Sequence, residues 1–306
     1  MSPHWAPVAL LLLVACGGER RPPQMPLARR GDPQAQLVTF PSRDADVTPN
    51  GAPTTIEGVL FRPAGAGPFP AIVVLHGCAG LYRETPEGGS LASRDREWAY
   101  RLRDLEYVVL MPDSFTTRGV REICHGNADP LLKPEIDRAR DAFGALAFLA
   151  QQPWVLADRV GLMGWSNGAM TVLATVEQGT KARAAAQPMT TDFRVAVAFY
   201  AGCRKELERH WVTKTPLTML SGVLDDWTPA APCVELVKRS RAEGQSVEIV
   251  LYPGAFHDFD APNMPIHQLT HIPSTPSGSA TVGTDPAARA DAIKRVPEIL
   301  AAALGR

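Results

Sequence analysis

Short apolar runs recur along most of the chain and alternate with segments whose apolar residues are spaced three or four apart. Gly, Pro and charged residues bound these runs, as is typical of strands buried on both faces of a sheet. Helices between such strands return the chain so that the strands run parallel. The pattern predicts the α/β class, with a mostly parallel central sheet and helices on both faces. The candidate strands are residues 56–62, 71–75, 107–111, 159–163, 195–200, 217–223 and 247–252.

Helical spacing is clearest in residues 135–150, where Ala139, Phe143, Leu146 and Leu149 fall on one face. Residues 169–176, 233–241 and 287–303 are also expected to be helical. We find no internal repeat, and residues 38–306 are expected to form one domain with a sizeable core.

One apolar run leads directly into a candidate nucleophile. Residues 159–163 are followed by Gly164-Trp165-Ser166-Asn167-Gly168 and then by the helical segment 169–176. A strand, Gly-x-Ser-x-Gly and a helix in this order describe a nucleophile elbow, a sharp turn that lifts a serine hydroxyl clear of the sheet. The motif alone also occurs in ordinary tight turns. The interpretation of Ser166 as a nucleophile therefore depends on its partners.

A serine nucleophile needs an imidazole to take its proton and a carboxylate to orient the imidazole. Asp225 and Asp226 follow the predicted strand 217–223, and His257 follows the predicted strand 247–252. Parallel strands end at one edge of a sheet, so these groups can converge on Ser166. We expect Asp225 and His257 to complete a triad. Asp226 is the alternative carboxylate, and one of the two aspartates would instead cap a helix beginning near Ala230.

Hydrolysis at a carbonyl also needs donors for the oxyanion. The backbone N–H after the nucleophile, that of Asn167, is expected to be one donor. The predicted strand 71–75 runs into His76-Gly77-Cys78-Ala79-Gly80, and the N–H of Cys78 is expected to be the other. Beside the triad positions, Trp165 and Trp227 either shape a substrate pocket or belong to the core.

Four blocks of this sequence resemble the dienelactone hydrolase family of the α/β-hydrolase superfamily. They are Leu75-His76-Gly77-Cys78-Ala79-Gly80, Gly164-Trp165-Ser166-Asn167-Gly168, Gly222-x-x-Asp225-x-x-x-Pro229 and Tyr252-Pro253-Gly254-Ala255-Phe256-His257-Asp258-Phe259. The resemblance covers roughly residues 38–305 and implies that fold, with Ser166, Asp225 and His257 at the nucleophile, acid and base positions. The founding members resemble this chain but carry a cysteine nucleophile, so the family name does not establish dienelactone as the substrate.

The amino terminus is expected to direct export. Residues 6–15 are nearly all apolar, too short to span a bilayer, and end in Leu13-Val14-Ala15-Cys16, which resembles a bacterial lipobox. We expect residues 1–15 to be a cleaved signal peptide, Cys16 to carry lipid, and residues 16–37 to be a flexible tether. Residues 1–5 contain no Lys or Arg, however, and secretion without lipid is the alternative.

The remaining four cysteines form an even set, which suits disulfides in an oxidising compartment. Their positions after strands expected to be neighbours favour Cys78–Cys124 and Cys203–Cys233. Four reduced, buried cysteines are the alternative.

Charge and spacing exclude several other functions. Lys and Arg number 31 and Asp and Glu 32, a balance that offers nucleic acid little to hold. No compact Cys or His spacing indicates a metal, and we expect no cofactor. The sequence predicts an exported serine hydrolase of a small-molecule carboxylic ester or lactone, touching the membrane only through Cys16. The alternatives are a peptidase or amidase, and a non-catalytic surface lipoprotein that uses the fold for binding.

Overall fold

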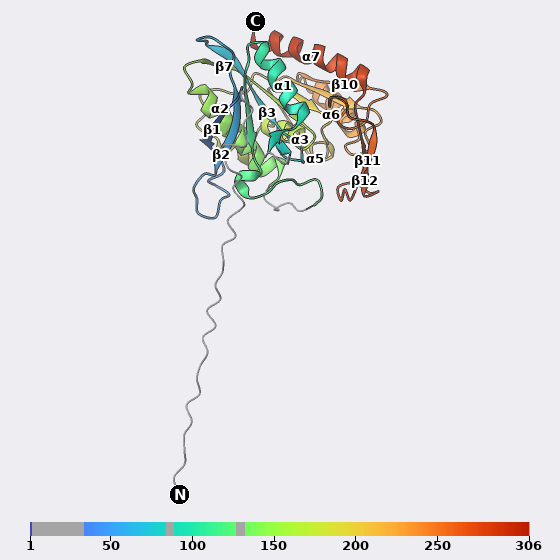
Figure 1. Cartoon of the computed structure of the whole chain (residues 1–306), viewed down its shortest axis with the longest axis horizontal. Coiled ribbons are helices and arrows are strands. Elements are labelled where there is room, and N and C mark those ends of the chain that lie inside the picture. The colour runs from blue at the N-terminus through green and yellow to red at the C-terminus, as the bar shows by residue number, and fades with distance from the viewer. Residues whose placement is uncertain (2–33, 84–88, 127–131, 306) are drawn as a thin grey trace.

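The structure is a computed structural model of the 306-residue chain and describes Met1 and residues 34–83, 89–126 and 132–305 (Figure 1). The expected signal peptide, Cys16 and most of the expected tether lie outside the described residues. Strand β1 begins at Gln36, two residues before the expected start of the domain.

An eight-stranded sheet forms the centre of the molecule, in the order β1-β2-β6-β3-β7-β8-β9-β10. Strands β1 and β2 are antiparallel to their neighbours, and the strands from β6 to β10 pair in parallel. This is the α/β-hydrolase architecture expected from the sequence. The strands are β1 (Gln36–Pro41), β2 (Thr55–Phe61), β3 (Phe69–Leu75), β6 (Val108–Asp113), β7 (Val155–Trp165), β8 (Val195–Phe199), β9 (Leu217–Gly222) and β10 (Val247–Tyr252).

Helices cover both faces of the sheet (Figure 1). Helices α2 (Ala139–Ala150), α3 (Asn167–Val176) and α6 (Ala231–Ala242) pack on one face, and α1 (Ser93–Asp104) and α7 (Pro286–Leu304) pack on the other. Successive residues of β3 point to opposite faces, so that Val73 joins the first core and Val74 the second. Both neighbours must therefore be apolar, which explains the uninterrupted apolar runs of the central strands.

One predicted helix differs from the expectation, and several other elements were not predicted. The expected helix 135–150 is not one continuous α-helix, because Pro134–Arg138 form a π-helical turn before α2. The Pro-, Ser- and Thr-rich segment 262–285 contains a hairpin of β11 (His267–Thr270) and β12 (Ser279–Val282). A smaller hairpin joins β4 (Tyr82–Arg83) and β5 (Ser90–Leu91). Shorter helices are α4 (Lys181–Ala185), α5 (Arg204–Leu207) and the 3₁₀ turn Thr116–Arg118.

Two disulfides lie in the segments that follow the carboxyl ends of the strands. They are Cys78–Cys124 and Cys203–Cys233, the same pairs that the sequence favours. Cys233 is in the first turn of α6. Within the described ranges, no helix has the length and apolar character needed to cross a membrane.

Candidate active site

Ser166 occupies the turn between β7 and α3. Its φ and ψ angles are 51° and −117°, a conformation that costs a non-glycine residue on the order of 1–3 kcal/mol. The turn packs so tightly that a Cβ on Gly168 would lie 2.1 Å from the carbonyl oxygen of Leu75. Only glycine fits there, and the close approach brings the elbow against the end of β3. The local sequence thus produces the sharp turn that a nucleophile elbow requires.

Asp225 and His257 meet because the ends of β9 and β10 approach closely. A Cβ on Gly222 would lie 2.2 Å from the carbonyl oxygen of Ala255, so glycine lets the two following loops touch. The Nδ1 atom of His257 then lies 2.8 Å from Oδ2 of Asp225. Both side chains are buried, the histidine at 1% exposure and the aspartate at 4%. The pair is therefore held in a fixed orientation away from bulk water.

Asp226 points elsewhere. It is exposed, and its carboxylate accepts hydrogen bonds from the backbone N–H and the hydroxyl of Thr281 in β12, at 2.7 and 2.8 Å. It caps no helix, since α6 begins after Ala230 without a side-chain cap. Of the two aspartates, Asp225 is the one that contacts the histidine.

The surroundings of Asp225 and His257 shift their pKa values in opposite directions. Burial lowers the pKa of His257, but the charge of Asp225 and the hydrogen bond to it outweigh burial and raise the pKa above its ordinary value. Burial raises the pKa of Asp225, whereas His257 and Thr228 lower it more, so the net shift is downward. Asp225 is thus held ionised and faces an imidazole that binds a proton readily.

Thr228 supports the same pair. Its hydroxyl lies 2.8 Å from the carbonyl oxygen of Tyr200 and 3.0 Å from Oδ2 of Asp225. The other carboxylate oxygen accepts the backbone N–H groups of Trp227 and Thr228, at 2.9 and 2.8 Å. Asp225 is therefore held by hydrogen bonds from its own loop as well as by the contact with His257.

Ser166 and His257 line one cavity but do not form a hydrogen bond. Among the described residues, the Ser166 hydroxyl has no hydrogen-bond partner. The structure thus brings Asp225 and His257 into contact. Ser166 and His257 line the same cavity but are not hydrogen-bonded to each other. Catalytic contacts of this kind are often long without substrate and tighten when it binds.

The two expected oxyanion donors lie beside Ser166. Asn167 is the first residue of α3, where a backbone N–H has no partner within the helix. Cys78 follows β3, lines the cavity next to Ser166, and is tied to Cys124 by the disulfide. Its carbonyl accepts the N–H of Ile123 at 2.9 Å. The loop that carries the Cys78 N–H is therefore held from both sides.

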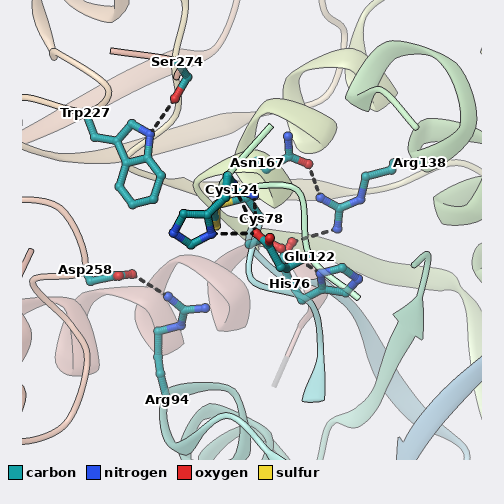
Figure 2. Close-up of a disulfide and its surroundings, with 12 residues drawn as sticks. His76, Cys78, Arg94, Glu122, Cys124, Arg138, Asn167, Trp227, Asp258 and Ser274 are labelled. Carbon is teal, nitrogen blue, oxygen red and sulfur yellow. Dashed lines mark hydrogen bonds and ion pairs between the residues drawn. A yellow bond between two sulfur atoms is a disulfide. The ribbon is translucent and has the colours of Figure 1, made fainter. Parts of the chain in front are cut away.

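Arg138 lies behind these donors, as Figure 2 shows. Its guanidinium is fully buried and donates to the carbonyl of His76 at 2.7 Å and to the side-chain oxygen of Asn167. In the described part of the chain, the groups that it contacts directly are neutral. They are these two hydrogen-bond acceptors and the ring of Phe115, whose centre is 4.9 Å away. Burial lowers the pKa of Arg138 to about 9, which leaves it charged at neutral pH. A buried cation thus links the elbow to the loop of the second donor.

His76 itself is structural. Its ring is fully buried against Phe115, and Nδ1 lies 2.8 Å from the carbonyl of Gly77. Burial and the charge of Arg138 lower its pKa well below the ordinary value, so the ring is neutral. This arrangement holds the donor loop in place.

A second charged group lies on the opposite side of the site. Arg94 of α1 contacts Asp258 at 2.8 Å (Figure 2). It also contacts Asp95 at 2.8 Å and the Tyr200 hydroxyl at 3.0 Å. Asp260 accepts hydrogen bonds from Tyr200, Trp98 and Trp165, at 2.8, 2.9 and 2.9 Å. Trp165 is therefore a core residue, whereas Trp227 stacks 4.8 Å from the His257 ring and lines the site.

Ser166 borders two cavities. The small cavity, of about 140 Å³, also has Arg94, His257, Asp258 and Leu269 in its walls. The large cavity, of about 570 Å³, extends along α3 past Met170 towards α5. Cys78, Cys124 and Trp227 separate the two and belong to both.

Motif reasoning missed Thr228, Arg138 and Arg94. Thr228 lies three residues after Asp225 in Asp225-Asp226-Trp227-Thr228-Pro229, where a side chain can return to the same turn. Arg138 occurs one turn before Ala142 on the apolar side of a helical pattern, and a charge at such a position is a signal of a buried partner. Arg94 lies in a polar helix and carries no comparable signal.

Comparison with known proteins agrees with this fold. The model of the Dienelactone hydrolase family matches residues 56–304. A relative from Bradyrhizobium sp, named as a probable 2-oxo-3-(5-oxofuran-2-ylidene)propanoate lactonase, is 24% identical over 213 residues, which are 65% of this chain and 77% of the relative.

Solved structures share the fold. Esterase 2 of Thermogutta terrifontis, phosphorylated by paraoxon, superposes with a TM-score of 0.58 at 16% identity and covers 88% of this chain and 94% of its own. A dienelactone hydrolase from Anabaena variabilis gives 0.55 at 19% identity, covering 89% and 99%. Since the family match spans most of the chain, the protein belongs to the dienelactone hydrolase family and is a carboxylic ester hydrolase.

Proposed function

We propose that this protein is an exported serine esterase or lactonase in which Ser166, His257 and Asp225 form the catalytic triad. The observation that carries the proposal is the buried Asp225–His257 pair, which opens onto the same cavity as the strained Ser166. Strain at one residue and burial of a carboxylate beside an imidazole both oppose folding, and they are retained where they serve a site.

The reaction follows from the positions of the groups. His257 takes the proton of Ser166 through Nε2, because Nδ1 faces Asp225. The serine oxygen attacks the carbonyl carbon, and the N–H groups of Asn167 and Cys78 stabilise the oxyanion. His257 then gives its proton to the leaving oxygen, and the acyl group remains on Ser166. Water, activated by the same histidine, releases the acid and restores the serine.

Export is part of the proposal. Two disulfides suit an oxidising compartment. The apolar residues 6–15 and the Leu13-Val14-Ala15-Cys16 sequence supply a signal and a lipidation site. In a bacterial host, we expect the protein in the membrane fraction and the Cys16→Ser variant in the soluble fraction. If the wild type is soluble and mass spectrometry shows an unmodified amino terminus, the protein is secreted without a lipid anchor.

The catalytic assignment is tested by labelling with a fluorophosphonate, which reacts with activated serines. Intact mass should show one adduct on the wild type and none on Ser166→Ala, whose thermal midpoint should remain close to that of the wild type. Hydrolysis of short p-nitrophenyl esters should fall to background in the same variant. Equal labelling of both proteins would place the nucleophile elsewhere. Parallel assays with p-nitroanilides separate ester from amide hydrolysis.

A further inference from the structure

We propose that the large cavity binds the acyl group and the small cavity binds the leaving alcohol. The preferred substrates are then esters of bulky carboxylic acids with small alcohols. This inference rests on the proposed catalytic role of Ser166. It states which cavity holds each side of the ester bond, which the positions of the triad residues alone do not determine.

The first step is the position of Ser166 between the cavities. Ser166, Cys78, Cys124 and Trp227 belong to the walls of both. A carbonyl carbon bonded to the Ser166 oxygen, with its oxyanion towards the Cys78 and Asn167 N–H groups, can extend one substituent into each cavity. The acyl group and the leaving oxygen must therefore take opposite sides.

The position of the proton donor decides which side each takes. The leaving oxygen must receive a proton from Nε2 of His257. His257 lines the small cavity and is absent from the walls of the large one, where Asn167 and Met170 of α3 lie instead. The alcohol consequently leaves through the small cavity, and the acyl group occupies the large one.

The volumes match this division. The large cavity presents mainly apolar groups, and its volume lies in the range that holds a drug-sized ligand. Its apolar walls include Ile123, Met170, Ala174, Pro229, Pro232 and Pro276, and the charged residues Glu135, Arg204, Lys205 and Glu206 also line it. The small cavity is also mainly apolar but has only about a quarter of that volume, so it favours a short alcohol.

Arg94 is not available as a carboxylate-binding fork. Its Nε and Nη2 atoms face Asp95, and its Nη1 atom faces Asp258 and Tyr200. These contacts occupy four of its five N–H groups, so Arg94 offers no two-pronged site for a second acid group in the small cavity.

Two ester series test the assignment. One series keeps a methyl alcohol and lengthens the acyl chain from acetyl to decanoyl; the other keeps acetyl and lengthens the alcohol. For the wild type, kcat/KM should rise about two- to fourfold for each buried methylene in the first series. It should fall once the alcohol exceeds a few carbons in the second.

Substitutions that fill each cavity provide the matched comparison. Met170→Trp should lower the decanoate-to-acetate ratio of kcat/KM at least about tenfold. Leu269→Trp should instead lower the ratio of butyl to methyl acetate. Leu251→Trp adds similar bulk on β10, at a side chain that is 42% exposed and outside both cavities, and should alter neither ratio.

The outcomes separate this inference from the proposed function. A preference for long alcohols over long acyl groups, blocked by Met170→Trp, would reverse the assignment. Fluorophosphonate labelling without any chain-length preference would also overturn it, while the catalytic role of Ser166 stands. Folded protein that is neither labelled nor active on either series would instead contradict the proposed function itself.

Discussion

Arg138 donates a hydrogen bond to the side chain of Asn167, the residue whose backbone N–H is expected to stabilise the oxyanion in the proposed reaction. The same guanidinium donates to the carbonyl of His76, two residues before the other expected donor. One buried cation therefore links both segments that carry these N–H groups.

Replacing this arginine is expected to affect the transition state more than substrate binding. Arg138→Met should lower kcat about 10- to 100-fold with a smaller change in KM, because the donors lose their common anchor. Affinity for a trifluoromethyl ketone, which forms an oxyanion on Ser166, should fall in parallel. Steady-state kinetics and inhibition constants provide the measurement.

The neighbouring Arg140 is the matched control. It is equally buried, but its guanidinium pairs with Asp46 at 2.6 Å, outside both cavities. Arg140→Met should lower the thermal midpoint without a comparable loss in kcat. If the two variants lost stability and kcat to the same degree, Arg138 would have only a structural role.

The choice between the paired aspartates gives a second prediction. Asp225→Asn should reduce kcat by about 10⁴, since the histidine loses the carboxylate that orients and stabilises it. Asp226→Asn should cost less than about tenfold, because that side chain only fastens Thr281. Comparison of kcat for the two purified variants decides the matter. A greater loss in Asp226→Asn would exchange their roles.

The pH dependence follows from the raised pKa of His257. The histidine must be neutral to accept the serine proton, so activity should rise with pH through the histidine pKa. Because Asp225 keeps the proton bound, the acid limb of kcat/KM should lie above the ordinary histidine value of about 6.5. In Asp225→Asn, burial is no longer opposed, and the limb should move to lower pH. A wild-type limb below pH 6 would contradict this assignment.

The disulfides should differ in their effect on catalysis. Their sequence separations of 46 and 30 residues imply similar stabilisation, about 3.5–4 kcal/mol each by loop entropy. Replacing both cysteines of either pair by serine should lower the thermal midpoint by similar amounts. Only loss of Cys78–Cys124 frees the loop of an oxyanion donor, so kcat should fall further in that variant. Equal kcat in the two variants would contradict the role given to this loop.

The sequence predicted the elements whose stability is local or whose apolar pattern is continuous. The central strands and the turns around Ser166, Asp225 and His257 belong to this group. Helix α1 escaped prediction because its buried face is narrow, with Trp98, Ala99 and Leu102 among charged neighbours. In the hairpin at 262–285, β11 lacks alternating apolar residues and β12 alternates over only four residues, and the hairpin is also held by polar contacts such as Thr281 with Asp226.

The site could be predicted only where chemistry requires a residue type in a motif. Arg138 contacts His76, and Asp260 contacts Trp98, each far away in the chain. The position of Arg138 in its helix indicates that it is buried, but the neighbouring sequence does not identify the partner of either residue. Such networks emerge only when the fold brings their members together.

The hairpin of β11 and β12 has a consequence for how this protein can acquire new substrates. Gly283 at its end donates to the carbonyl of His257 at 3.0 Å, and Leu269 lines the small cavity. Ser274 and Pro276, in the turn between its strands, line the large cavity. A change in the length of residues 271–278 can therefore reshape the wall of the large cavity, while the hydrogen bond from Gly283 still holds His257 in place. Evolution or directed selection has a route to new specificity here that leaves the reaction itself intact.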